Sequence, residues 1–245
     1  MNRQAWLLTA IALTLTLARW TPETSAQRPK SKARDAELKI LPADAPGSKT
    51  SSQFLQKPGD DRYDPNANDW REVPPWKQTS FFGIRAKGQL FIYVVDCSGS
   101  MIDEDRLIRA KRELRRSVLA LQHPQRFKVV FYNDQVVPMP GDLPRSADLT
   151  SKSQMVQWLR LIEPDGETDP RGAMSLALSL RPDAVFLLSD GEFPEGTVEA
   201  IARKNGRKIP IHCIDLSNDS GGEQLQRIAR DSGGQYRWRP QVDGP

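Results

Sequence analysis

The sequence predicts an α/β fold of the doubly wound class, with a mostly parallel central sheet and helices on both of its faces. Between residues 88 and 240, short apolar runs alternate with longer segments whose apolar residues recur at helical spacing. The apolar runs are continuous, as expected of strands that are covered on both faces of a parallel sheet. No internal repeat of fixed period appears, so the pattern does not indicate a repeat architecture.

The alternation can be followed along the chain. A strand is predicted over QLFIYVVD (89–96), a helix over 103–122 and a second strand over RFKVVFYND (126–134). The short QVVPMP (135–140) is expected to be an edge strand, because its two prolines cannot donate hydrogen bonds to a ladder. The remaining elements are expected as helices over 151–162, 170–180, 197–206 and 222–234, and as strands over 184–190, 209–216 and 235–239.

The first residues have the composition of a targeting segment. Residues 1–26 combine a basic residue, an apolar stretch and a region of small residues, the pattern of a secretory signal peptide. The apolar stretch is short for a permanent membrane span, which takes about 20 residues. Cleavage near Ala26 is the preferred interpretation, an uncleaved amino-terminal anchor is the first alternative, and a cytosolic protein is the second. A secreted or periplasmic protein is therefore expected, in contact with a membrane only if the leader is uncleaved.

The segments between the leader and the domain differ in composition. Residues 27–65 are crowded with Pro, Ser, Lys, Asp and Gly and lack an apolar period, so they are predicted to be a flexible linker. Residues 66–87 contain clustered tryptophans and phenylalanines. They are interpreted as a strap that packs on the domain through its aromatic rings, with ligand stacking as the alternative. Residues 241–245 form a tail.

Net charge and cysteine content exclude some classes of protein. The formal net charge of +4 is too small to indicate nucleic-acid binding by itself. Cys97 and Cys213 are the only cysteines, so a disulfide-stapled mini-domain is excluded. A bridge between them would require neighbouring positions, and two buried free thiols are the preferred expectation.

Oxygen-bearing side chains gather where ligands bind in a doubly wound sheet. Asp96, Ser98 and Ser100 follow the first strand, Thr168 lies in a loop before a helix, and Asp190 ends the strand AVFLLSD. Carboxylates and hydroxyls suit a hard divalent cation, Mg²⁺ or Mn²⁺, whereas the thiolate and imidazole ligands of zinc are lacking. Such a ligand set leaves coordination positions open for a carboxylate from another molecule. The alternative for the first three residues alone is a polar turn that caps the next helix.

The motifs DCSGSM, DGETDPRGAM and LLSDGE, in this order, resemble those of a von Willebrand factor type A domain with a metal-ion-dependent adhesion site. The resemblance covers roughly residues 88–240. It implies a Rossmann-like fold and metal-dependent binding of another protein, through an acidic group that completes the Mg²⁺ shell. The matched positions imply that the metal is held by Asp96, Ser98, Ser100, Thr168 and Asp190.

Other polar residues receive structural interpretations. Glu167 and Asp169 flank Thr168 and are not predicted to be ligands. His123 and His212 lack a catalytic partner, and His212 is expected in the core. Three acidic residues near the start of the first helix are expected to complement its dipole, namely Asp103, Glu104 and Asp105. The same helix carries a basic face that is interpreted as solvated, with an anionic partner as the alternative: Arg106, Arg109, Lys111, Arg112, Arg115 and Arg116.

These observations favour an exported, non-enzymatic protein that binds a protein ligand, and no nucleic acid, through a divalent cation. A scaffold whose docking is independent of the metal is the first alternative. A metal-dependent hydrolase is disfavoured, because the chain has neither a phosphate-binding glycine loop with a lysine nor a Gly-x-Ser-x-Gly motif.

Overall fold

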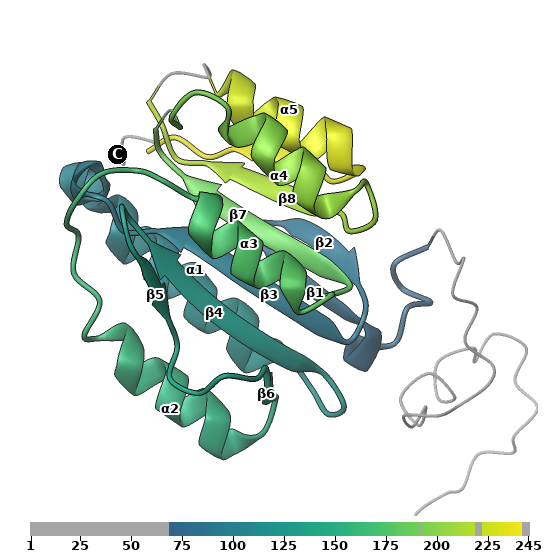
Figure 1. The fold of residues 1–245 in the computed structure, drawn as a ribbon. Coiled ribbons are helices and arrows are strands. Elements are labelled where there is room, and N and C mark those ends of the chain that lie inside the picture. The colour runs from purple at the N-terminus through teal and green to yellow at the C-terminus, as the bar shows by residue number, and fades with distance from the viewer. Residues whose placement is uncertain (1–68, 192, 219–221, 242–245) are drawn as a thin grey trace, which may run out of the picture. The chain divides into compact units, whose positions relative to one another are not determined.

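A computed structural model describes residues 69–191, 193–218 and 222–241 of the chain (Figure 1). The predicted signal peptide, the predicted linker and most of the tail lie outside the described residues. Within these ranges, every helix is too short or too polar to span a bilayer.

The described residues contain a central sheet in which β3 lies between β4 and β7. Its order is β5-β4-β3-β7-β8-β9, with β6 pairing with β4. The inner pairs are parallel, whereas β5 and β6 run antiparallel to β4. The strands are β3 (Leu90–Asp96), β4 (Arg126–Tyr132), β5 (Val136–Pro138), β6 (Arg145–Ser146), β7 (Ala184–Ser189), β8 (Ile211–Asp215) and β9 (Tyr236–Trp238). The predicted doubly wound sheet and the edge strand β5 are confirmed, while β6 was not predicted.

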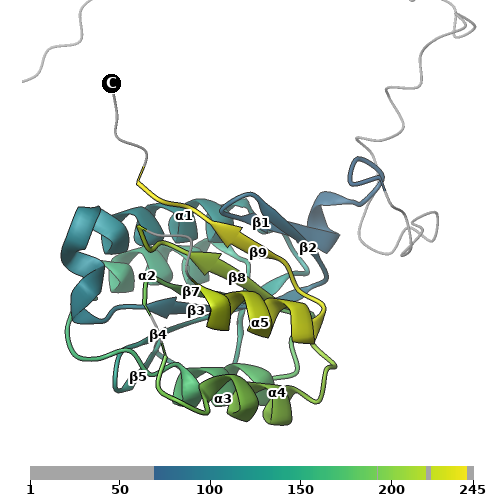
Figure 2. The same ribbon diagram turned by 90° about the horizontal axis from the view of Figure 1, so that it is seen from above.

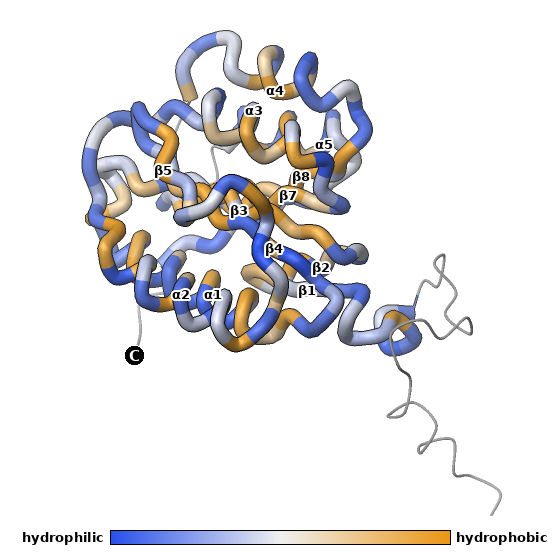
Figure 3. Tube along the Cα trace, turned by 60° about the horizontal axis from the view of Figure 1, so that its bottom comes forward, coloured by the Kyte–Doolittle hydropathy of each residue, from blue (hydrophilic) through white to orange (hydrophobic). Residues whose placement is uncertain are grey.

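Helices cover both faces of this sheet (Figure 2). Two of them, α1 (Arg106–Ala120) and α2 (Leu149–Leu159), pack on one face, and α3 (Arg171–Ser179), α4 (Thr197–Asn205) and α5 (Glu223–Ser232) pack on the other. Figure 3 shows the most hydrophobic stretches in the central strands β3, β7 and β8, whereas α1 and α2 alternate between hydrophobic and hydrophilic residues. Each helix therefore buries one side only, as its apolar spacing predicts.

The segment expected to be a strap contains a β-hairpin. A short 3₁₀ turn, η2 (Pro75–Lys77), leads into β1 (Gln78–Phe81), which pairs with β2 (Ile84–Lys87). The turn residues Phe82 and Gly83 both have positive φ, at 48° and 78°, the backbone of a tight hairpin turn whose twist suits the strands. Phe81 is fully buried, and its ring lies edge-on to Tyr93 at 5.3 Å between ring centroids. The hairpin thus helps to cover the face of the sheet that α1 covers.

The two cysteines are free and buried, as expected. Cys97 packs in the core beneath α1, whereas Cys213 packs in the core beneath α3, α4 and α5. The sheet lies between these two cores, so the thiols cannot reach each other to form a bridge.

His212 is a core residue, as expected. Its Nδ1 accepts a hydrogen bond from the Gln235 amide at 3.1 Å, and its ring lies against Phe186 at 5.2 Å between centroids. Burial lowers the pKa of His212 to about 4. Because the folded pKa lies below the unfolded value, His212 contributes stability above pH 6.5 that is lost as the pH falls towards 4.

This shift predicts a specific acid sensitivity. Between pH 7 and pH 4, wild-type protein is expected to lose about 3 kcal/mol more of its free energy of unfolding than the His212→Gln variant loses. Urea denaturation of both proteins at the two pH values measures this difference. Equal losses in the two proteins would show that His212 does not titrate in this way.

Candidate metal centre

The predicted ligands lie at the carboxyl ends of β3 and β7, the two neighbouring strands between which the winding of the sheet reverses. Asp96 is the last residue of β3, and Asp190 follows directly after β7. In the parallel register Val95 lies opposite Leu188, so the backbone brings the two aspartates to the same edge of the sheet.

Asp96 is a completely buried carboxylate with fixed orientation. Its Oδ1 accepts a hydrogen bond from the Ser98 amide at 2.8 Å, and its Oδ2 accepts one from the Ser189 hydroxyl at 2.6 Å. Burial raises the pKa of Asp96 to about 6, and the hydrogen bonds from Ser189 and Ser98 only partly oppose this effect. Burial therefore makes the charged form of Asp96 energetically unfavourable, and a bound cation would stabilise that charge.

The serines join Asp96 to Asp190. The hydroxyls of Ser98 and Ser100 lie 3.2 Å apart, and Ser100 Oγ donates a hydrogen bond to Asp190 Oδ1 at 2.9 Å. Ser98 is buried and Ser100 is exposed. One end of this oxygen cluster is therefore open to solvent, where an external ligand could approach.

The loop that carries Thr168 is bound to the end of β3 by backbone hydrogen bonds. The Asp165 amide donates to the Cys97 carbonyl at 2.9 Å, and the Gly99 amide donates to the Gly166 carbonyl at 3.0 Å. Gly166 has a φ of 75°, and a side chain there would collide with Asp134. A side chain at Gly191 would begin 3.9 Å from Thr168 Oγ1, so this hydroxyl lies beside Asp190. The structure thus brings all the predicted ligands together.

Arg106 occupies part of the same site, which corrects the interpretation that it belongs to a solvated face. Its Nη1 lies 2.6 Å from Asp190 Oδ2, and the two side chains are 8% and 0% exposed. The same nitrogen lies 3.4 Å from the Ser100 carbonyl oxygen, and Nη2 lies 3.8 Å from Glu104. Arg106 Nε is buried and has no hydrogen-bond partner in the described part of the chain. A protein cation therefore already neutralises one predicted metal ligand.

The start of α1 explains why Arg106 turns inward. The helix begins at Arg106 and not at residue 103, after a 3₁₀ stretch, η3 (Gly99–Asp105), in which Glu104 and Asp105 have positive φ values of 53° and 54°. Asp105 is the N-cap residue of α1, without a side-chain cap hydrogen bond, and Asp103 and Glu104 precede it, so the expected dipole role of these three residues stays a prediction. Glu104 accepts a hydrogen bond from Asn218 at 2.7 Å.

Neighbouring acidic groups are engaged elsewhere. Asp169, next to Thr168, forms an ion pair with Arg171 at 2.6 Å, and hydrogen bonds from Arg171 lower its pKa. The described residues contain no group of three or more His, Cys, Asp or Glu side chains with metal-binding geometry. The donors at the site are two carboxylates and three hydroxyls, oxygen ligands that suit a hard divalent cation.

Two participants were missed from the sequence, Arg106 and Ser189. Ser189 directly precedes Asp190 at the end of a buried strand, so its position was a usable signal. Arg106 gave no such signal, because it stands in a run of basic residues that looks uniform in sequence.

Comparisons with known proteins agree with this architecture. The sequence profile described as von Willebrand factor type A domain matches residues 90–238, more than half of the chain. A structure described as von Willebrand factor type A from Catenulispora acidiphila is similar with a TM-score of 0.56 and 19% identity; the match covers 63% of this chain and 40% of that one. At this identity the likeness establishes the fold alone.

Two further structures are similar. An aerotolerance-related membrane protein from Bacteroides fragilis NCTC 9343 has a TM-score of 0.49 and 19% identity, over 64% of this chain and 92% of that one. The manganese-loaded TRAP protein of Plasmodium vivax has a TM-score of 0.49 and 15% identity, over 62% of this chain and 68% of that one. No curated protein sequence matches the chain significantly. From the profile match and the observed sheet order, the chain belongs to the von Willebrand factor type A domain family.

Proposed function

We propose that this protein is an exported binding module that engages an acidic group of a protein ligand through Mg²⁺ or Mn²⁺. The ion would be held by Asp96, Ser98, Ser100, Thr168 and Asp190. The convergence of these oxygen-bearing side chains at one edge of the sheet is the observation that carries the proposal.

The chemistry of the site favours binding over turnover. The bound cation would supply a positive centre with open coordination positions for a ligand carboxylate. Asp96 would be a fixed anionic ligand, and Ser100 would lie on the solvent side, where the ligand enters. The side chains that most often act as bases or nucleophiles are badly placed: His212 is buried with a low pKa, and burial raises the pKa of the Cys97 thiol to about 12.

Water-proton relaxation with Mn²⁺ tests the proposal. Mn²⁺ bound to the purified full chain is expected to enhance relaxation through its exchanging water, and Mg²⁺ is expected to compete with it. A short glutamate-containing peptide should reduce the enhancement by displacing water, whereas the same peptide with glutamine should not.

The matched variants are Thr168→Ala, within the site, and Ser153→Ala, on the exposed side of α2. Thr168→Ala should weaken Mn²⁺ binding and Ser153→Ala should leave it unchanged. Equal binding by both variants would refute the assigned site. Equal responses to the two peptides would refute the acidic ligand, and glutamate-peptide binding that survives a chelator would favour the metal-independent scaffold.

A further inference from the structure

A second feature that could bind a ligand lies between α1 and α2, away from the oxygen cluster. It is a groove with a volume of about 510 Å³. From α1 it is lined by Arg112, Arg115, Arg116 and Leu119, which are spaced as one stripe of a helix, and by Lys111. From α2 it is lined by Val156, Leu159 and Arg160, which also form one stripe.

The groove combines a cationic rim with an apolar floor. Leu119 is 43% exposed although it is a large apolar side chain, and Val156 and Leu159 continue the apolar surface on the facing helix. The expected basic face of α1 is thus divided: Arg106 binds Asp190, Arg109 donates to the carbonyls of Arg239 and Pro240, and the other basic residues surround the groove.

The positive charge of the rim is largely uncompensated within the described chain. The side chains of Arg112, Arg115 and Arg160 form neither an ion pair nor a hydrogen bond with any described residue. Glu113 lies 3.7 Å from Arg116 and also accepts the Phe82 amide at 3.1 Å. Three guanidinium groups therefore remain available to an anionic partner.

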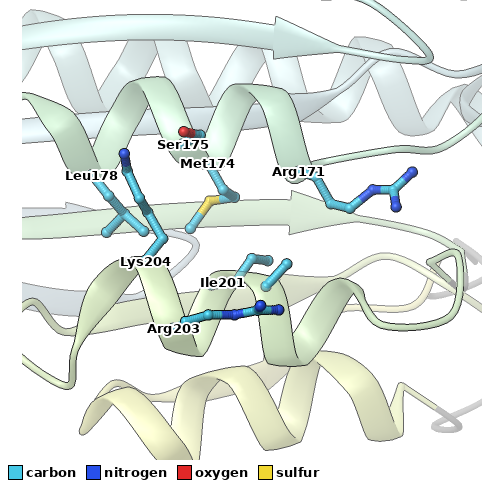
Figure 4. Close-up of a pocket in the computed structure, with 8 residues that line it drawn as sticks. Arg171, Met174, Ser175, Leu178, Ile201, Arg203 and Lys204 are labelled. Carbon is cyan, nitrogen blue, oxygen red and sulfur yellow. The ribbon is translucent and has the colours of Figure 1, made fainter.

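A comparable hollow lies between α3 and α4 and has a volume of about 420 Å³ (Figure 4). Arg171, Arg203 and Lys204 extend from its two helices around Met174 and Ile201. Arg171 is already paired with Asp169, so fewer free charges remain there. This hollow is the natural internal control for the groove between α1 and α2.

We propose that the groove between α1 and α2 is a docking site for an acidic amphipathic helix of another protein. Apolar side chains on one face of such a helix would contact Leu119, Val156 and Leu159, and carboxylates beside them would pair with the arginines. The stripe from Arg112 to Leu119 spans about 10 Å, or two turns of a bound helix.

The features of the groove distinguish this partner from others. A nucleic acid would use the arginines but leave the apolar floor uncovered, and a membrane would meet a hollow instead of a flat surface. The chain's own residues 27–65 carry more Lys and Arg than Asp and Glu, so they are a poor electrostatic match for this rim. Another protein with an acidic helix fits both the charge and the apolar floor.

Fluorescence anisotropy with a designed peptide tests this docking site. The probe is a labelled helical peptide of about 18 residues with leucine along one face and glutamate elsewhere; a peptide of the same composition in scrambled order is its control. The full chain, with chelator present, should bind the first peptide saturably and the scrambled peptide at least roughly tenfold more weakly. The chelator separates this result from that of the metal site.

Three variants locate the binding. The Arg112→Glu/Arg115→Glu double variant and Leu119→Asp should each weaken binding by roughly tenfold or more. Arg203→Glu/Lys204→Glu, which changes the net charge as much as the first double variant but alters the other hollow, should leave binding unchanged. If both double variants lost peptide affinity equally, the loss would follow from the change in net charge and not from the groove, and the proposal would be overturned.

Two other outcomes would also overturn it. One is the absence of saturable binding, or equal binding of the ordered and scrambled peptides. The other is binding of heparin or of phosphatidylserine vesicles that is lost in Arg112→Glu/Arg115→Glu while the peptide does not bind. The latter outcome would assign the groove to an anionic polymer or a membrane surface.

Discussion

Replacement of Arg106 by glutamine is expected to tighten Mn²⁺ binding by roughly tenfold or more, since tenfold corresponds to only about 1.4 kcal/mol. In the wild type the guanidinium lies 2.6 Å from Asp190, so a cation must share or displace this partner. Unit charges about 4 Å apart interact by about 4 kcal/mol at an effective dielectric constant of 20. A fraction of such a repulsion between the guanidinium and Mn²⁺ is enough to account for the tenfold change in affinity. Isothermal titration calorimetry of both proteins measures it.

The same variant is expected to be less stable without metal. Removal of one partner of a buried ion pair leaves a buried charge, at a cost of about 3 to 5 kcal/mol. Added Mn²⁺ should therefore raise the melting temperature of Arg106→Gln more than that of the wild type.

Arg109→Gln is the control for the Arg106 variant, because the Arg109 guanidinium donates hydrogen bonds to the carbonyls of Arg239 and Pro240 and makes none to Asp190. It should leave Mn²⁺ affinity unchanged. Weaker Mn²⁺ binding by Arg106→Gln would show that Arg106 positions Asp190 for the metal and does not compete with it.

Asp96→Asn is expected to weaken Mn²⁺ binding by roughly a hundredfold or more, because it removes the buried charged ligand. It should also stabilise the metal-free protein at neutral pH. The folded pKa of Asp96, about 6, lies above the ordinary value of 3.8 that it has in the unfolded chain. Asp96 therefore favours folding fully below pH 3.8, and this contribution is lost as the pH rises through about 6.

At pH 7.5 the metal-free wild type therefore carries a destabilisation of about 3 kcal/mol that asparagine removes. Urea denaturation in chelator should show this gain at pH 7.5 and little of it at pH 4. Asp215→Asn is the control, because Asp215 is also a buried aspartate at the end of a central strand, β8, but its carboxylate accepts from Ser217 and Tyr236 and makes no hydrogen bond to a predicted metal ligand. A metal-free Asp96→Asn protein that is less stable than the wild type at pH 7.5 would contradict the assigned pKa.

The central sheet was predictable because burial on both faces leaves a direct mark on the sequence. The runs that became β3, β4, β7 and β8 are continuous apolar segments, and the prolines of β5 restrict it to an edge. The short β6 left no such mark, since Arg145 and Ser146 pair with β4 from a polar segment. The hairpin was also missed, because Phe82 adopts a positive φ that its side chain does not predict.

The oxygen-bearing residues of the site were predictable for a related reason. A doubly wound sheet places strand ends at one edge, so residues distant in sequence can be assigned to one location. The pairing of Arg106 with Asp190 was not predictable. It depends on left-handed backbone at Glu104 and Asp105, which shifts the start of α1 and changes the direction of its first side chain.

The hairpin of β1 and β2 precedes the residues that match the family profile but packs with them as part of one domain. The Phe82 amide donates to Glu113 of α1 at 3.1 Å, and its carbonyl accepts from Arg239, beyond β9, at 3.1 Å. Phe81 and Ile84 contribute fully buried side chains to the core. The family profile spans residues 90–238, yet Phe81 and Ile84 of this core precede that span, and Arg239, which bonds the hairpin turn, follows it. The region that matches the family and the region that packs as one core therefore have different boundaries. A fragment that starts at the family boundary would lack part of its own core.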